Sequence, residues 1–149
     1  MSGRYMVTGQ QSPVGTGEKT SLEMLGSATH RFWLYDLLWG ASGTPADNAL
    51  VHSLIRITAT GTGTTVVAEP LDPADVTATV ICEEDSTIEP TVTGIPILEV
   101  PVNLRATYRW VAAPDSEIVV AAVAGEGLAN RVLAASYTGQ SEVTAGWIE

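Results

Sequence analysis

Two glycine-rich stretches contain residue types that bind phosphate groups in other proteins. GTGEKT, residues 15–20, resembles a phosphate-binding loop, but Glu18 stands where a glycine must directly precede the lysine. No apolar strand leads into it either. TGTGTT, residues 60–65, lacks the third glycine and the following helix of a dinucleotide-binding loop, and is more typical of a flexible hairpin turn. We therefore expect neither segment to bind a nucleotide.

The side chains that build metal sites and nucleophiles are few and far apart. His30 and His52 fall on separate predicted strands, with no cysteine close in the sequence and no spacing typical of a metal site. The single cysteine, Cys82, follows two apolar residues and has no basic neighbour, which predicts a buried, unreactive thiol rather than a nucleophile. The sequence thus predicts no catalytic cysteine, no metal site and no cofactor.

Acidic residues are the most abundant ionisable side chains, since the chain has 17 Asp and Glu. The run EEDSTIE, residues 83–89, lacks the alternating acids and turn glycine of a known calcium loop, so we expect a solvated loop, with a weak cation site as the alternative. Any two of these acids are compatible in type with a glycosidase pair, but their abundance does not indicate one. Because no constellation of nucleophile, base and acid emerges, we predict that the protein is not an enzyme.

Asp36 differs from the other acids because it lies among apolar residues. If its carboxylate is buried, it needs a charged hydrogen-bond partner. Arg56 or Arg109, each on a predicted strand, is the expected partner.

Charge and length exclude further classes of protein. The 149 residues carry a net charge of -10, with only seven basic residues, so no basic patch can follow a nucleic-acid backbone. No apolar run approaches the ~18 residues of a membrane span, because Asp36, Arg56 and Glu99 interrupt the longest candidates. The lone cysteine and a start without the apolar run of a signal peptide predict a protein of a reducing compartment.

Short alternating runs indicate strands, and the clearest is LRATYRWVA, residues 104–112. In it Tyr108 and Trp110 share one face, expected in the core, while Arg105 and Arg109 share the other. Further candidate strands are RYMVT, HRFWLYDLLWG, VHSLIRITA, TTVVA, IPILEV, EIVVAAV, RVLAASY and EVTAGWIE.

These runs predict an all-β fold, a β-sandwich or jelly-roll-like fold of about eight to ten strands. Helix signals are limited to single turns at LDPADVTA and TPADNAL. We expect one domain over residues 1–149, with residues 1–20 as a possible extended N-terminal arm.

The segment HRFWLYDLLWG, residues 30–40, is apolar on both faces. Arg31, Trp33, Tyr35, Leu37 and Trp39 alternate with Phe32, Leu34, Asp36 and Leu38. Such a strand needs a cover on each side. Either a loop of the same chain covers the second face, or a neighbouring subunit does, since aromatic residues are enriched in interface cores.

Five segments resemble, in order and spacing, small structural proteins of tailed bacteriophages: RFWLYDLLWGASGTPADNALVHSLIR, TATGTGTT, LDPAD, EPTVTG and VPVNLRATYRWVAAP. Within that group the chain looks most like the head decoration or cement proteins. The resemblance covers about Tyr5 to Asn130 and is strongest over Leu34–Arg56 and Asn103–Pro114. The chain departs from the pattern after Pro114, where relatives tend to carry glycine and this sequence has Asp115.

The resemblance implies a β-sandwich or jelly-roll protein, made in the host bacterial cytoplasm, that sits on the outer capsid surface of the virion. It also implies the major capsid protein as partner, self-association as a homotrimer, no catalytic residues and no membrane or nucleic-acid partner. A tail- or fibre-associated module that binds a host receptor or glycan is the alternative. Six side chains are the candidates for subunit or capsid contacts: Arg31, Trp33, Tyr35, Trp39, Arg105 and Arg109.

Overall fold

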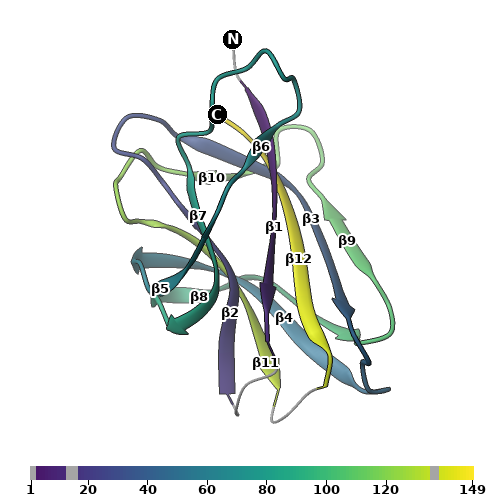
Figure 1. Cartoon of the computed structure of the whole chain (residues 1–149). Coiled ribbons are helices and arrows are strands. Elements are labelled where there is room, and N and C mark those ends of the chain that lie inside the picture. Colours follow the sequence, from purple (N-terminus) through teal and green to yellow (C-terminus); the bar gives the residue numbers. More distant parts are fainter. Residues whose placement is uncertain (1–2, 13–16, 135–137) are drawn as a thin grey trace.

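A computed structural model describes residues 3–12, 17–134 and 138–149, and these residues form twelve strands and no helix (Figure 1). The predicted all-β fold is therefore confirmed, with more strands than the expected eight to ten. The strands are β1 (Arg4–Gln11), β2 (Gly17–Leu25), β3 (Phe32–Ser42), β4 (Ala49–Ala59), β5 (Thr62–Val66), β6 (Glu69–Pro70), β7 (Ile81–Ile88), β8 (Thr91–Asn103), β9 (Tyr108–Val111), β10 (Ile118–Val120), β11 (Gly127–Ala134) and β12 (Gln140–Ile148).

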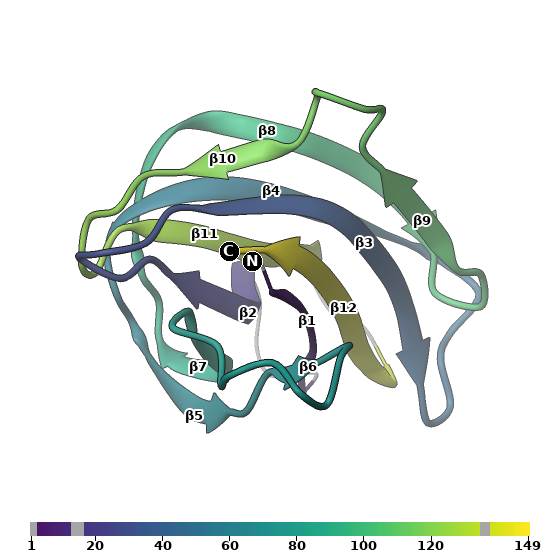
Figure 2. The ribbon, with the colours of Figure 1, turned by 90° about the horizontal axis from the view of Figure 1, so that it is seen from above.

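The strands form two antiparallel sheets that pack together as a β-sandwich (Figures 1 and 2). Sheet A has the order β10-β3-β12-β1-β6, and β9 also pairs with β3. Because β10 pairs with residues 32–34 and β9 with residues 36–39, these two short strands follow one another along β3. Sheet B has the order β5-β7-β2-β11-β4-β8.

The N-terminal segment belongs to sheet A and is not an arm. All eight residues of β1 pair with β12, from Arg4 opposite Ile148 to Gln11 opposite Ser141. The expected arm over residues 1–20 is therefore wrong for β1 and for residues 17–20, which begin β2. Residues 13–16 of that segment, and residues 135–137 of the predicted strand RVLAASY, lie outside the described residues.

Aromatic side chains from sheet A dominate the core between the sheets. Trp147 of β12 stacks on Tyr5 of β1, with ring centroids 5.9 Å apart, and meets Phe32 of β3 edge to face at 6.4 Å. Leu22 and Met24 of β2 contribute to the same buried cluster from sheet B. Burial of such large apolar side chains is the main stabilising contribution, at roughly 2–3 kcal/mol each.

Four strands of sheet B form one long ribbon. Two-residue links join β4 to β5 and β7 to β8, and the antiparallel pairing continues from β4–β8 into β5–β7. The middle of this ribbon lies against β2, where the Glu23 carboxylate accepts hydrogen bonds from Thr60 Oγ1 (3.2 Å), the Gly61 amide (3.0 Å) and Ser86 Oγ (2.9 Å). The ribbon therefore covers the face of β2 that points away from the core.

This ribbon corrects two expectations from the sequence. Residues 60–65 do not form a hairpin turn, because β4 and β5 do not pair with each other. Gly61 is needed for close packing instead, since a Cβ there would lie 2.2 Å from the Ile88 carbonyl oxygen. Residues 83–89 are not a solvated loop, because all but the last lie in β7, between β2 and β5.

Local turn chemistry replaces the expected helical turns. In LDPADVTA, Asp72 Oδ1 accepts a hydrogen bond from the Ala74 amide at 2.9 Å, and the Asp72 carbonyl accepts one from Asp75. The result is a tight turn of the kind that aspartate side chains favour. The segment TPADNAL contains no helix either, so both expectations of a helical turn are wrong.

The predicted strand 104–112 is shorter than expected, because Asn103 ends β8 with a turn. The Asn103 carbonyl accepts from Ala106, and its side chain accepts from the Arg105 amide at 2.9 Å. Only residues 108–111 then form β9, an edge strand that leaves Tyr108 39% exposed. The prediction that Tyr108 is a core residue is therefore wrong, and Trp110 is only partly buried.

Candidate functional site

A β-bulge decides which side chains of β3 face outward. Asp36 lies opposite Gly146 of β12, whereas Leu34 lies opposite Trp147, so Tyr35 is an extra residue in β3. The bulge reverses the alternation after Tyr35. Consequently the buried residues Phe32, Leu34, Leu37 and Trp39 all face the core, while Trp33 and Leu38 are exposed on the outer face.

Trp39 is a core residue and not a contact residue. Its side chain is 0% exposed, and its ring stacks between His52 at 5.5 Å and Tyr108 at 5.6 Å. The indole Nε1 donates to Asn130 Oδ1 at 2.6 Å, and Asn130 Nδ2 donates in turn to Ser21 Oγ at 2.7 Å. The sequence placed Trp39 among the contact candidates because the bulge at Tyr35 has no clear signature in the pattern.

The structure confirms the predicted arginine partner of Asp36. Arg109 Nε donates to Asp36 Oδ1 at 2.9 Å, and Arg109 Nη2 donates to Oδ2 at 2.6 Å. The pair joins β3 to β9, and its hydrogen bond and charge raise the pKa of Arg109. Arg56, the other candidate, donates instead to the carbonyl of Val119 at 3.0 Å.

Register brings apolar residues from three strands together on the outer face of sheet A. Trp33 lies directly opposite Val119 of β10 on one side and Ile148 of β12 on the other. Directly opposite residues project from the same face, so these three side chains form a row. Leu38 of β3 and Val111 of β9 add exposed apolar surface along the same sheet edge. We call these five residues the outer apolar face.

A hollow of about 300 Å³ opens on this side of sheet A. It is lined by Arg4, Tyr35, Ala112, Pro114, Glu117 and Ile148. The Tyr35 ring lies close over Gly146, where a Cβ would be 3.3 Å from the ring. Ala112, Pro114 and Glu117, in the link between β9 and β10, form one wall of the hollow.

The turn in that link is tight although Asp115, and not a glycine, follows Pro114. Asp115 takes up the left-handed conformation with φ of 65°, which aspartate tolerates better than most residues. The Ser116 amide donates to the Ala113 carbonyl at 3.0 Å. This turn holds Pro114 and Glu117 in place at the hollow.

Two basic side chains on this side of the protein are unpaired. Among the described residues, Arg4 and Arg31 form no ion pair and no side-chain hydrogen bond, whereas the other five basic side chains each have a partner: Lys19 with Glu89, Arg56 with the Val119 carbonyl, Arg105 with Asp47, Arg109 with Asp36 and Arg131 with Glu18. Arg4 lines the hollow, and Arg31 directly precedes β3. Of the other predicted contact residues, Trp33 lies in the outer apolar face, Tyr35 lines the hollow and Arg109 pairs with Asp36, while Arg105 lies apart in the turn after β8.

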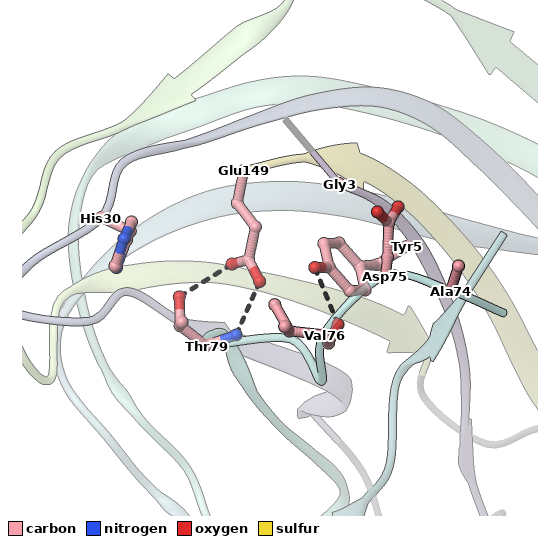
Figure 3. A pocket seen from close by; sticks show the side chains of 8 residues that line it. All are labelled: Gly3, Tyr5, His30, Ala74, Asp75, Val76, Thr79 and Glu149. Atoms are coloured by element: carbon pink, nitrogen blue, oxygen red, sulfur yellow. Dashed lines mark hydrogen bonds between the residues drawn. The ribbon is translucent and has the colours of Figure 1, made fainter. Parts of the chain in front are cut away.

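A second hollow, of about 320 Å³, lies at the end of the sandwich near both termini (Figure 3). Several of its polar groups are hydrogen-bonded to one another. The Glu149 carboxylate accepts from the amide (2.6 Å) and hydroxyl (2.9 Å) of Thr79, and the Tyr5 hydroxyl donates to the Val76 carbonyl at 3.0 Å. Burial, followed by Glu149 and Asp75, raises the pKa of Tyr5. These contacts tie β1 and Glu149 to the segment between β6 and β7.

The acidic residues of the described segments show no catalytic arrangement. Glu23 and Glu83 lie directly opposite each other on β2 and β7, but Glu23 is 0% exposed and its oxygens accept three hydrogen bonds. Asp85 accepts hydrogen bonds from the side chain of Gln11 and the amide of Ser12. Within residues 3–12, 17–134 and 138–149, no three His, Cys, Asp or Glu side chains gather as metal ligands.

The remaining candidate for chemistry is buried, as predicted. Cys82 lies in the core, and burial raises the pKa of its thiol to about 12, so the thiolate that would act as a nucleophile does not form near neutral pH.

Comparisons with protein-family models, curated proteins and solved structures found no match. In the parts of the chain that the structure describes, there is no helix with the length and apolar character needed to cross a bilayer.

Sequence reasoning missed several residues of the candidate site, namely Arg4, Ala112, Pro114, Glu117, Val119 and Ile148. They come from three separate segments that only the register of β1, β3, β10 and β12 brings together. The one local signal was the second apolar face of residues 30–40.

Proposed function

We propose that this protein is a structural protein of a tailed-bacteriophage virion. It binds the outside of the capsid, contacts the major capsid protein, and stabilises the shell by bridging neighbouring capsid subunits. It self-associates, as a homotrimer, and carries out no catalytic step. The sequence resemblance over about Tyr5 to Asn130 supports the virion role, and the β-sandwich agrees with the fold that the resemblance implies.

The observation that carries the proposal is the outer apolar face. Trp33 is 37% exposed and Val111 is 55% exposed, although a chain with a net charge of -10 has ample polar residues to place there. Exposed apolar surface that includes a tryptophan is typical of interface cores. Association through this face removes it from water.

Many weak contacts suit a protein that covers a lattice. When three linked copies engage three equivalent capsid sites, the second and third contacts form at a high effective concentration, so modest interfaces give firm attachment. Binding to the assembled shell alone then stabilises it by mass action. The negative charge favours the outer surface, because packaged DNA repels an acidic protein.

Imaging of purified virions with and without the protein tests the proposal. We expect density for it on the outer capsid surface that is absent from particles lacking it and returns when it is added. Trp33→Asp protein should fail to restore the density, whereas Val67→Asp, a change at an exposed valine after β5, should restore it. Density confined to the tail or fibres would contradict the proposal and favour a receptor- or glycan-binding module.

A further inference from the structure

His52 of β4 is an ionisable side chain in an apolar part of the core. It is 2% exposed, and its Nδ1 atom is buried without a hydrogen-bond partner among the described residues. Val100 of β8 and Val132 of β11 lie directly opposite it, so its neighbours on the inner face of sheet B are apolar. A buried polar group without a partner destabilises the fold, and a charge at the same place destabilises it far more.

The charged residues of the two neighbouring strands project away from His52. Glu99 of β8 and Arg131 of β11 lie opposite Ser53, the next residue of β4, so their side chains belong to the other face of sheet B. No opposite charge therefore offsets the burial of the imidazole. Burial lowers the pKa of His52 to about 4, and its protonation requires acid.

Three stacked rings connect His52 to the surface of the protein. The His52 ring lies 5.5 Å from the Trp39 ring at an angle of 20°, and the Trp39 ring lies 5.6 Å from the Tyr108 ring at 13°. Trp39 is fully buried, whereas Tyr108 is 39% exposed. The stack therefore runs from the buried imidazole to solvent at β9.

The strand that carries Tyr108 can separate from sheet A without breaking any other strand pairing. β9 has four residues, lies at the edge of the sandwich and, among the described residues, pairs with β3 alone (Figure 1). Its other ties to β3 are the ion pair of Arg109 with Asp36 and a hydrogen bond of 2.9 Å from the Ala112 amide to the Tyr35 carbonyl. Short elements with few contacts open at a lower free energy than the core does.

From these features we propose that protonation of His52 releases β9 from sheet A. The imidazolium faces no carboxylate from the described parts of β3, β8, β9 or β11, so water is the partner that can stabilise it. Global unfolding supplies that water at the expense of the whole core. Departure of β9 uncovers the outer end of the ring stack instead, and water reaches His52 as Trp39 shifts toward the place that Tyr108 has left.

The release also removes one wall of the sheet A hollow. Ala112, Pro114 and Glu117, which form that wall, follow β9 directly along the chain. The hollow is therefore formed near neutral pH and opened in acid. The device belongs to the isolated chain and does not depend on capsid binding, so its failure would leave the proposed function untouched.

Amide hydrogen exchange of the purified full chain, followed by NMR spectroscopy between pH 7 and pH 4, tests the release. Protection factors correct for the intrinsic pH dependence of exchange. The Ala112 amide should be less protected at pH 7 than the amides of β11 and β12 in the sheet centres, because it exchanges through local opening. With the ordinary pKa of 6.5 for His52 in the open form and about 4 in the closed form, protection of Ala112 should fall about 100-fold between pH 7 and pH 4.

Substitutions at His52 identify the group responsible. His52→Phe keeps an aromatic ring on Trp39 and cannot be protonated, so the protection of Ala112 should lose its pH dependence. His52→Gln should lose it too, whereas His30→Gln, at an exposed histidine, should retain the wild-type dependence.

Three results would overturn the inference. In the first, the protection of Ala112 in the wild type does not change with pH. In the second, it equals that of β11 and β12 at every pH, so that β9 opens only when the whole protein unfolds. In the third, it falls in both His52 variants as it does in the wild type.

Discussion

Arg109 of β9 donates two hydrogen bonds, 2.9 and 2.6 Å long, to the carboxylate of Asp36 on the neighbouring strand β3. Asp36 is 6% exposed, while the guanidinium that covers it faces solvent. A bidentate pair of this kind fixes geometry as well as charge. It holds the edge strand β9, and thereby the wall of the hollow, against β3.

Loss of the arginine should loosen this edge of sheet A. Arg109→Met leaves the Asp36 carboxylate buried without its partner, so we expect a clear drop in the urea midpoint of unfolding. Arg105→Met is the control, because Arg105 pairs with Asp47 at 3.9 Å on the surface and its loss should change the midpoint little. Equal midpoints for the two variants would show that the Asp36 pair has no special structural role.

The two faces of β3 should respond differently to the same substitution. Trp39→Ala creates a core cavity and leaves Asn130 without its donor, and should lower the free energy of unfolding by about 3–5 kcal/mol. Trp33→Ala, on the outer face, should cost under about 1 kcal/mol in the isolated protein. Urea unfolding measures both. Similar losses of unfolding free energy for the two variants would show that the faces assigned to Trp33 and Trp39 are wrong.

The sequence predicted the strand-rich class and most strand positions because alternation of apolar residues is a local signal. β3, β4, β9 and β12 were all found in this way. β2 and β7 were missed for a physical reason. β2 lies under the ribbon of β4, β5, β7 and β8, so Glu23 on its outer face is buried and polar. β7 contains the acidic run Glu83–Asp85, so neither strand has a simple alternation of apolar and polar residues to detect.

The candidate site was predictable only in part. The apolar second face of residues 30–40 identified Trp33, and an acid among apolar residues identified the Asp36–Arg109 pair. The bulge at Tyr35 exchanged the faces of Leu37 and Trp39, which period-two reasoning cannot foresee. The residues opposite Trp33 depend on long-range register, which one sequence does not reveal.

Stability should fall in mild acid because of His52. Burial lowers the pKa of this histidine to about 4, against 6.5 in an unfolded chain, so the unfolded state binds the proton first as the pH falls. The free energy of unfolding should therefore decrease by about 3 kcal/mol between pH 6.5 and pH 4. Urea titrations across this range should show a smaller decrease for His52→Gln. His30→Gln, at an exposed site, should keep the wild-type dependence; a His52→Gln protein that also keeps it would contradict the assignment.

Replacement of Glu23, whose carboxylate is buried under the ribbon, should destabilise the protein more than replacement of its neighbour Glu83. Glu23→Gln replaces an acceptor oxygen with an amide donor, so at least one of the groups that donate to it loses its acceptor, at a cost of about 1–3 kcal/mol. Glu83→Gln affects a side chain that accepts one hydrogen bond, from the Gly63 amide, and should cost less. If Glu83→Gln lowers stability in thermal or urea unfolding more than Glu23→Gln does, the conclusion that the ribbon covers β2 is wrong.

The temperature at which virions release their DNA tests the proposed capsid role most directly. It should be measured for complete particles, for particles lacking this protein, and for those particles after the purified protein is added back. Particles without the protein should release DNA at a lower temperature and resist osmotic shock less well, and addition of the protein should restore both properties. If particles without it resist heat and osmotic shock equally well but fail to adsorb to cells, the protein is not a capsid cement and a receptor-binding role takes its place.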